Sequence, residues 1–240
     1  MNINIFLLCY NESVLLPHTI KHYKKYMPTC KITIYDNHST DNSVEIAKTL
    51  GCNCISFETK DITNDFKMIE IKNNSWKEIQ TGWIIVADMD EFLCITEEEL
   101  REEMNQGTTI LQIQGKDMIG ESNTINISDI ELQDIKKYVY NSYLDKSLCF
   151  LREKITEMNY HCGAHICNPV GEIKYSSKKY TNKHMCNLGL IFLINKMKAR
   201  YERTIKMREK YNMCTHYNNN EEQITNDYMN MLNNCNYLDI

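Results

Sequence analysis

The stretch that decides the fold is Trp83-Ile84-Ile85-Val86-Ala87-Asp88-Met89-Asp90-Glu91-Phe92-Leu93, an apolar run that ends in three carboxylates. A short run rich in Ile and Val, followed by polar residues, is typical of a buried strand in a mostly parallel sheet. Ligands of open α/β sheets bind just beyond the carboxyl ends of such strands. We therefore expect Asp88, Asp90 and Glu91 to lie where chemistry takes place.

The spacing of the two aspartates predicts a bound cation. Side chains two positions apart on an extended chain point to the same side, so Asp88 and Asp90 are expected to lie together. Two neighbouring carboxylates repel each other unless a cation lies between them. A hard divalent ion such as Mg²⁺ or Mn²⁺ accepts oxygen ligands and leaves places for a substrate phosphate. An Asp-x-Asp pair taken alone is equally typical of a solvated turn or a helix cap.

The first residues of the chain predict the opening of a βαβ unit. A short apolar strand, Ile3 to Cys9, is followed by the polar turn Tyr10-Asn11-Glu12-Ser13, and a helical pattern begins at Val14. A second strand is expected over Ile32 to Tyr35 and a third over Cys54 to Phe57.

The second strand ends in a long polar turn that begins with Asp36. A carboxylate at this position suits the ribose hydroxyls or a base N–H of a nucleotide, so we expect Asp36 to contact a nucleoside. The alternative is a polar turn that only caps a helix. In either case Ser39 or Thr40 is expected to cap the helix over Val44 to Leu50.

In three motifs the chain resembles a family-2-type glycosyltransferase of GT-A fold. These are, in the family's order and spacing, Tyr10-Asn11-Glu12, Asp36-Asn37-x-Ser39-Thr40-Asp41-x-Ser43 and Asp88-x-Asp90-Glu91-Phe92. The Asp-Glu-Phe ending is closer to the branch found in bacteria and large DNA viruses than to cellulose or chitin synthases. The resemblance extends more loosely to about residue 217, through Lys183-His184-Met185, Arg200-Tyr201-x-Arg203 and Thr215-His216-Tyr217.

The resemblance implies an α/β fold with a mostly parallel central sheet and one domain over residues 1–240. Residues 1–100 would bind the nucleotide-sugar, residues 101–217 would bind the acceptor and complete the metal site, and residues 218–240 would form a helix or tail. It also implies a nucleotide-sugar donor, a Mn²⁺ or Mg²⁺ ion, and a hydroxyl acceptor on a glycan, a lipid-linked molecule or a protein. A UDP-sugar is the first candidate for the donor.

The resemblance further assigns residues to the donor and the metal. Those assigned to the nucleotide-sugar are Tyr10, Asn11, Glu12, Asp36, Lys72, Asp88, Met89, Arg200 and Arg203. Those assigned to the metal are Asp88 and Asp90, completed by His184 as first choice or His165 as second. Either histidine is equally well read as a surface or packing residue, and the segment 72–74 as a solvated helix face.

The helix expected over Leu188 to Tyr211 carries many Lys and Arg residues. A basic amphipathic helix can lie on an anionic membrane surface. Its arginines can equally bind a diphosphate at two points, or the helix can simply be solvated on one face.

A glycosyl transfer that inverts configuration needs a carboxylate to accept the acceptor proton. Glu121, Asp117 and Glu91 are the candidates, and the first two follow a strand expected to end near Gln114. A reaction that retains configuration needs no such base. The sequence also leaves two other classes open, a nucleotidyltransferase and a non-catalytic protein that binds nucleotide-sugars. The glycine-free turn after the first strand disfavours the former, and the intact aspartate pair disfavours the latter.

Composition narrows the partners and the compartment. The 240 residues carry a net charge of −5, so no basic footprint predicts nucleic-acid binding. No apolar run is long enough to span a membrane, and the N-terminus lacks the features of a signal peptide. The 11 cysteines, without a secretory signal, are expected to be free thiols in a reducing compartment. We therefore expect a cytoplasmic protein, in the host cytoplasm if it is viral.

Overall fold

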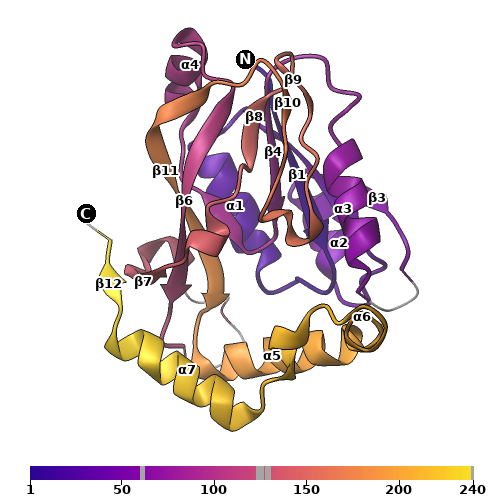
Figure 1. Ribbon diagram of the computed structural model, residues 1–240, viewed down its shortest axis with the longest axis vertical. Coiled ribbons are helices and arrows are strands. Elements are labelled where there is room, and N and C mark those ends of the chain that lie inside the picture. Colours follow the sequence, from indigo (N-terminus) through magenta and orange to yellow (C-terminus); the bar gives the residue numbers. More distant parts are fainter. Residues whose placement is uncertain (60–62, 123–126, 128–130, 239–240) are drawn as a thin grey trace.

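A ten-stranded mixed sheet lies at the centre of the computed structural model, which describes residues 1–59, 63–122, 127 and 131–238 (Figure 1). Its strand order is β12-β7-β6-β8-β4-β1-β2-β3, and β11 pairs with both β6 and β5. The strands are β1 (Ile3–Cys9), β2 (Lys31–Asp36), β3 (Asn53–Ser56), β4 (Trp83–Asp88), β5 (Glu91–Leu93), β6 (Ile110–Ile119), β7 (Lys137–Tyr140), β8 (Cys149–Leu151), β11 (Tyr175–Asn187) and β12 (Asn236–Tyr237). A separate two-stranded sheet joins β9 (Ile155–Glu157) to β10 (Val170–Gly171).

Helices connect and cover the strands. The α-helices are α1 (Leu16–Tyr26), α2 (Ser43–Thr49), α3 (Asp65–Asn74), α4 (Glu97–Asn105), α5 (Leu190–Arg203), α6 (Ile205–Tyr211) and α7 (Glu221–Asn233). Short 3-10 helices are η1 (Leu132–Asp134), η2 (Ser142–Leu144), η3 (Cys162–Ala164) and η4 (Thr215–Asn218).

Alternate residues of the central strands enter two different cores, because successive side chains of a strand point to opposite faces of the sheet. On one face, Ile5 and Ile85 pack in the core that contains Leu16 and Tyr23 of α1. On the other face, Phe6, Ile84 and Val86 pack with Trp76, which follows α3, and with Tyr160. Burial on both faces explains why these strands read as continuous apolar runs.

The strands β3, β2, β1 and β4 run parallel and end at one edge. Their register pairs Cys9 with Asp36 and Leu8 with Asp88, so two carboxylates lie on either side of the end of β1. The predicted arrangement of these strands is confirmed. The sheet thereby presents the two polar turns and the Asp88–Glu91 segment at one edge.

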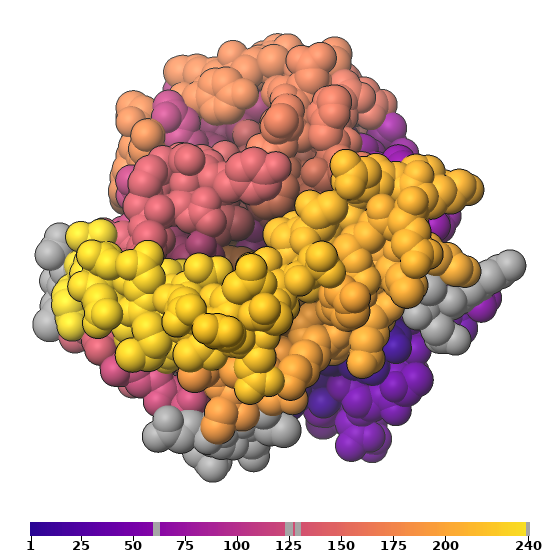
Figure 2. All heavy atoms as spheres, turned by 60° about the horizontal axis from the view of Figure 1, so that its bottom comes forward, coloured from indigo at the N-terminus to yellow at the C-terminus, as the bar shows by residue number. Residues whose placement is uncertain are grey.

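Helices α5, α6 and α7 lie across this carboxyl-terminal edge (Figures 1 and 2). A small third core joins α5 and α7 to the sheet through Ile119, Leu193, Ile224 and Tyr228. The Tyr228 hydroxyl donates to the carbonyl oxygen of Gly120 at 2.6 Å, and β12 then pairs antiparallel with β7. Residues 221–237 therefore form a packed helix and a short strand.

Three expectations about local structure were wrong. The predicted single helix over 188–211 is two helices divided at Thr204, whose hydroxyl donates to the carbonyl oxygen of Arg200 at 2.7 Å. Such bonding from Thr back to the preceding turn bends or interrupts helices. Neither Ser39 nor Thr40 caps α2, since its N-cap residue is Asn42. The strand expected to end near Gln114 continues to Ile119 and includes Asp117.

Candidate active site

Asp88, the last residue of β4, lies between two buried lysines. Its carboxylate oxygens are 2.6 Å from Lys72 Nζ of α3 and 3.1 Å from Lys146 Nζ, and each lysine side chain is 4% exposed. Burial alone would raise the pKa of Asp88, but the two ammonium groups outweigh it and hold the pKa well below its usual range. Asp88 is therefore a carboxylate at neutral pH. The interpretation of Lys72 as part of a solvated helix face was wrong, because its side chain is buried in this ion pair.

Glu91, the first residue of β5, completes this pocket. Its Oε1 is 2.9 Å from Lys146 Nζ, and its Oε2 accepts the backbone N–H of Asp88 at 2.8 Å. The side chain is only 1% exposed. We define the Asp88 pocket as Lys72, Asp88, Glu91 and Lys146. Because Glu91 is enclosed and already paired, it is poorly placed to take a proton from an acceptor.

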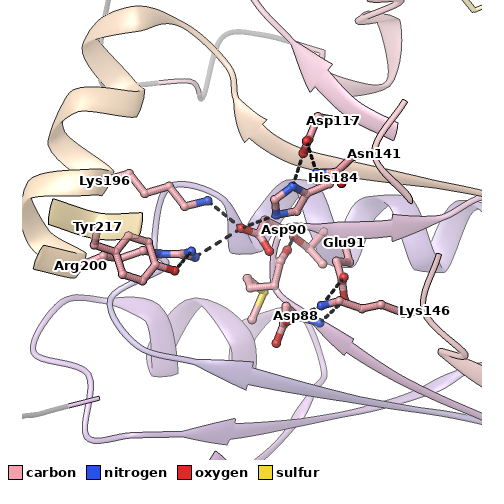
Figure 3. A network of polar contacts seen from close by, with 12 residues as sticks. Asp88, Asp90, Glu91, Asp117, Asn141, Lys146, His184, Lys196, Arg200 and Tyr217 are labelled. Atoms are coloured by element: carbon pink, nitrogen blue, oxygen red, sulfur yellow. Dashed lines mark hydrogen bonds and ion pairs between the residues drawn. The ribbon is translucent and has the colours of Figure 1, made fainter. Parts of the chain in front are cut away.

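Asp90 lies in a different pocket, to which the C-terminal half contributes (Figure 3). Three basic groups approach its Oδ2: Lys196 Nζ at 2.6 Å, His184 Nε2 at 3.4 Å and Arg200 Nη2 at 3.4 Å. Burial alone would raise the pKa of Asp90, but Lys196 and His184 lower it well below its usual range. We define the Asp90 pocket as Asp90, His184, Lys196 and Arg200.

The separation of these pockets corrects the expectation that Asp88 and Asp90 share one side of an extended chain. Residues 89 and 90 form a turn between β4 and β5, which the hydrogen bond from Asp88 N–H to Glu91 closes. The side chain of Met89, expected to contact the donor, is instead in the core, and its carbonyl oxygen accepts the Thr19 hydroxyl at 2.7 Å.

His184, in β11, is oriented by Asp117 in the neighbouring strand β6. Its Nδ1 is 2.6 Å from Asp117 Oδ1, and Asn141 Nδ2 donates to Asp117 Oδ2 at 2.7 Å. Burial lowers the pKa of His184, but Asp90 and Asp117 outweigh it and raise the pKa well above its ordinary value. The bond to Asp117 fixes the orientation of the His184 ring, so that Nε2 faces Asp90.

His165, the second histidine candidate, lies elsewhere. Its Nδ1 is 2.7 Å from the carbonyl oxygen of Tyr143, and its ring stacks on the Tyr143 ring at 4.2 Å between centroids. Glu121 is also remote from both pockets, since its carboxylate is 59% exposed and pairs with Lys137 at 2.6 Å. Of the three candidate bases, Asp117 alone contacts the Asp90 pocket, and both its oxygens already take part in hydrogen bonds.

The two turns at the ends of β1 and β2 are joined by side-chain hydrogen bonds. Asn11 donates its backbone N–H to Ser39 Oγ at 2.8 Å and accepts the N–H of Thr40 on its side-chain oxygen at 2.7 Å. Asp36 is 4% exposed and accepts both the N–H and the hydroxyl of Ser39. These contacts fix the turn in which the expected nucleoside residues lie.

Glu12 and Tyr10 connect this turn to α5. Burial raises the pKa of Glu12 to about 7, an effect that nearby Lys196 opposes and Asp90 reinforces. The guanidinium of Arg203 lies over the Tyr10 ring at 3.3 Å from its centroid. The expected donor-binding residues of the two halves of the chain are thus brought together.

A divalent ion fits the chemistry of the Asp90 pocket. A carboxylate and an imidazole with a carboxylate partner are suitable ligands for Mn²⁺, provided that His184 loses its Nε2 proton when the ion binds, and oxygen donors suit Mg²⁺. Within the described ranges, no three His, Cys, Asp or Glu side chains group into a metal site. An ion here would therefore take its other ligands from donor phosphate and water, as Mg²⁺ commonly does.

Sequence reasoning missed Lys146 and Asn141 altogether and did not single out Lys196. No motif marks Lys146, which reaches Asp88 from 58 positions away. Lys196 was visible only as one of several cations on a helix. Its spacing of four from Arg200, which places both on one helix face, was the available signal.

Comparison with known proteins supports one family. A model of "Glycosyl transferase family 2" matches residues 4–167 of the chain. The chain belongs to glycosyl transferase family 2. Protein RfbJ of Shigella flexneri is 34% identical to this family 2 chain over 59 residues, which are 25% of the chain and 46% of RfbJ. The match therefore spans less than half the length of that relative.

Solved structures resemble this family 2 chain distantly. S. aureus TarS has a TM-score of 0.45 and 11% identity, covering 96% of the chain and 43% of TarS. The 1-349 segment of TarS in complex with UDP has a TM-score of 0.47 and 11% identity, covering 97% of the chain and 79% of that segment. Mycobacterium tuberculosis glucosyl-3-phosphoglycerate synthase in complex with Mn²⁺, UDP and glucosyl-3-phosphoglycerate has a TM-score of 0.35 and 14% identity. The match covers 48% of this chain and 44% of the synthase. Family membership depends on the sequence match.

Two further observations concern the family 2 chain as a whole. None of the helices in the described part of the chain has the length and apolar character needed to cross a membrane. All 11 cysteines lie in described residues and are free thiols.

Proposed function

We propose that this protein is a metal-dependent glycosyltransferase that moves a sugar from a nucleotide-sugar to a hydroxyl acceptor. A UDP-sugar is the first candidate for the donor. The observation that carries the proposal is the Asp90 pocket. A buried carboxylate, an oriented histidine and two cations converge at the carboxyl edge of a family 2 sheet, where ligands of such sheets bind. The acceptor is a glycan, a lipid-linked molecule or a protein.

The donor would lie along this edge with its nucleoside at the turns after β1 and β2. Tyr10, Asn11, Glu12 and Asp36 line the junction of these turns, which hydrogen bonds within the protein hold in place. Arg203 covers Tyr10 from the C-terminal side. A preformed turn reduces the ordering cost of binding.

In this proposal Asp90 and His184 hold Mn²⁺ or Mg²⁺, and Asp88 keeps the neighbouring turn in place. When bound, the ion neutralises charge on the departing diphosphate, which is worth several kcal/mol. Lys196 and Arg200 already face this point and provide further positive charge. The ammonium group of Lys196 and the guanidinium group of Arg200 would move from Asp90 to phosphate oxygens, which also accept charged hydrogen bonds.

The chain's own groups also limit the acid–base chemistry. If configuration is inverted, Asp117 is the candidate carboxylate that is bonded to the Asp90 pocket, and its bond to His184 ties proton transfer to that histidine. A retaining reaction would use Asp117 only to orient His184. Free thiols throughout the chain support a reducing compartment such as the cytoplasm.

The test is a titration of UDP, GDP and TDP with and without Mn²⁺, followed by nucleotide release from the corresponding sugar donors. We expect one nucleotide to bind with an affinity that depends on Mn²⁺, and its sugar donors to release nucleotide. Equal affinity for every nucleotide with Mn²⁺ and with EDTA, and no release, would contradict the proposal.

A further inference from the structure

The segment 140–146, which begins at the last residue of β7 and leads to β8, is attached to β6 and to the active site at three points. Asn141 donates to Asp117, which holds His184. Asp145 accepts the backbone N–H of Gly115 at 2.7 Å, and Lys146 pairs with Asp88 and Glu91. The segment is therefore positioned by both pockets.

This attachment leaves little freedom at the middle of the segment. A Cβ atom at Gly115 would lie 2.6 Å from the backbone carbon of Leu144, so β6 and the segment are in close backbone contact. Asn141 also accepts the N–H of Tyr143 at 3.0 Å on its side-chain oxygen. A residue held in this way has a fixed backbone position relative to His184.

The residue so held is an exposed aromatic. The Tyr143 side chain is exposed, at 66% for the whole residue, and contacts the His165 ring with centroids 4.2 Å apart and planes inclined by 39°. His165 in turn bonds the Tyr143 carbonyl oxygen. Single exposed aromatic side chains are common on protein surfaces, so exposure alone assigns no ligand. Tyr143 differs because the segment that carries it is bonded to Asp117 and Asp88, which places its exposed ring next to the active site.

We propose that Tyr143 and His165 form a binding platform for a sugar ring of the acceptor, which makes the acceptor a saccharide. This inference rests on the proposed glycosyltransferase function. A pyranose has one face of C–H groups with partial positive charge, and the face of an aromatic ring is negative. An exposed aromatic ring on a segment that is bonded to Asp117 and Asp88 presents the surface that such a face needs.

The chemistry of the segment favours a saccharide over a membrane surface. Membrane-surface elements combine an extended apolar face with several exposed cations. The only cation in segment 140–146 is Lys146, which is buried, and Asp145 adds a negative charge. The nearby Tyr140 hydroxyl donates to Asp145 at 2.7 Å, so the surroundings of the platform are polar.

The experiment is saturation-transfer NMR of the full chain with UDP and Mn²⁺ and a panel of methyl glycosides of glucose, galactose, rhamnose and N-acetylglucosamine. We expect at least one glycoside to receive saturation at its ring C–H groups. Tyr143→Ser should weaken its apparent binding about five- to tenfold, the effect of losing one stacked apolar contact. Tyr143→Trp should retain it, because the aromatic face remains.

Tyr237→Ser is the matched control, since Tyr237 is 62% exposed on β12 away from the site and its loss should change nothing. Mn²⁺-dependent nucleotide binding is measured in every variant. Its absence from the parent protein would contradict the glycosyltransferase function itself.

Three results would overturn the platform while leaving that function intact. The first is no saturation of any glycoside in a parent that binds nucleotide. The second is equal saturation in the parent and Tyr143→Ser. The third is flotation with phosphatidylglycerol vesicles that Tyr143→Ser abolishes, which would assign the ring to a membrane.

Discussion

The Asp88 and Asp90 pockets begin two positions apart in the chain but differ in how deeply their cations are buried. Lys72 and Lys146 beside Asp88 are each 4% exposed, whereas Lys196, His184 and Arg200 beside Asp90 are 11%, 18% and 36% exposed. A fully buried charge cannot lose its partner without a large desolvation cost, but a more accessible cation can be resolvated or transferred to a ligand. The comparison indicates that the Asp88 pocket mainly supports the fold and the Asp90 pocket mainly performs chemistry.

The largest expected effect concerns the two lysines. Lys146→Met leaves Glu91 buried without a cation and should lower the free energy of unfolding by roughly 3–5 kcal/mol. Lys196→Met should cost less, roughly 1–2 kcal/mol, because Arg200 and His184 still face Asp90 and keep it paired. Urea unfolding of both variants measures the difference. Equal losses would show that the two pockets do not differ in this way.

Asp90→Asn should affect activity more strongly than it affects stability. Its activity should fall by roughly 100- to 1,000-fold, since a neutral amide is a weaker ligand for the ion and cannot balance its charge. The free energy of unfolding should also fall, by roughly 1–3 kcal/mol, because Lys196, His184 and Arg200 lose their counter-charge but are more accessible than Lys146. Nucleotide release and urea unfolding are measured on the same preparation. Glu121→Gln is the control, because Glu121 pairs with Lys137 outside both pockets. A variant that keeps parental activity would assign the chemistry elsewhere.

His22, which belongs to neither pocket, also makes the free energy of unfolding depend on pH. Its contribution must be separated before the pH dependence of the two pockets is compared. His22 is buried and its Nε2 bonds the carbonyl oxygen of Leu93 at 2.9 Å. Burial lowers the pKa of His22 from 6.5 to about 4, so the folded state binds fewer protons than the unfolded state between these values. The stability that this histidine contributes is therefore complete above the unfolded pKa and is lost as pH falls toward the folded pKa.

We expect this loss to be roughly 2 kcal/mol between about pH 7 and about pH 5. Urea unfolding at both pH values, with His22→Gln as comparison, isolates it. The glutamine amide can still donate to Leu93 but does not titrate. An equal pH dependence in parent and variant would assign the loss to another group.

The smallest expected effect refines the Asp90 pocket. Asp117→Asn keeps the size of the side chain but weakens its hold on His184 Nδ1, so Mn²⁺ affinity should fall about tenfold. Calorimetric titration with Mn²⁺ in the presence of nucleotide measures this without turnover. Nucleotide affinity in EDTA should stay unchanged, and a matching loss there would mean that Asp117 supports the whole site.

The central strands and the acidic turn could be predicted because burial on both faces imposes a continuous apolar run that ends abruptly at Asp88. The contacts that divide the two pockets could not. Lys196 is 106 positions from Asp90, and no local pattern encodes such a pairing. The same-side expectation for Asp88 and Asp90 failed because it assumed an extended chain, whereas the chain turns between β4 and β5. The interruption at Thr204 depends on one hydroxyl bond that helix periodicity does not reveal.

The pairing of β12 with β7 has a consequence for self-association. An edge strand carries unpaired N–H and C=O groups that can recruit a strand from another molecule. Here Asn236 and Tyr237 cover β7, and the strand at the other end of the order, β3, has only four residues. Both margins of the sheet therefore offer little template for growth. Removing residues 236–240 would uncover β7 and convert that margin into a site for intermolecular strand addition.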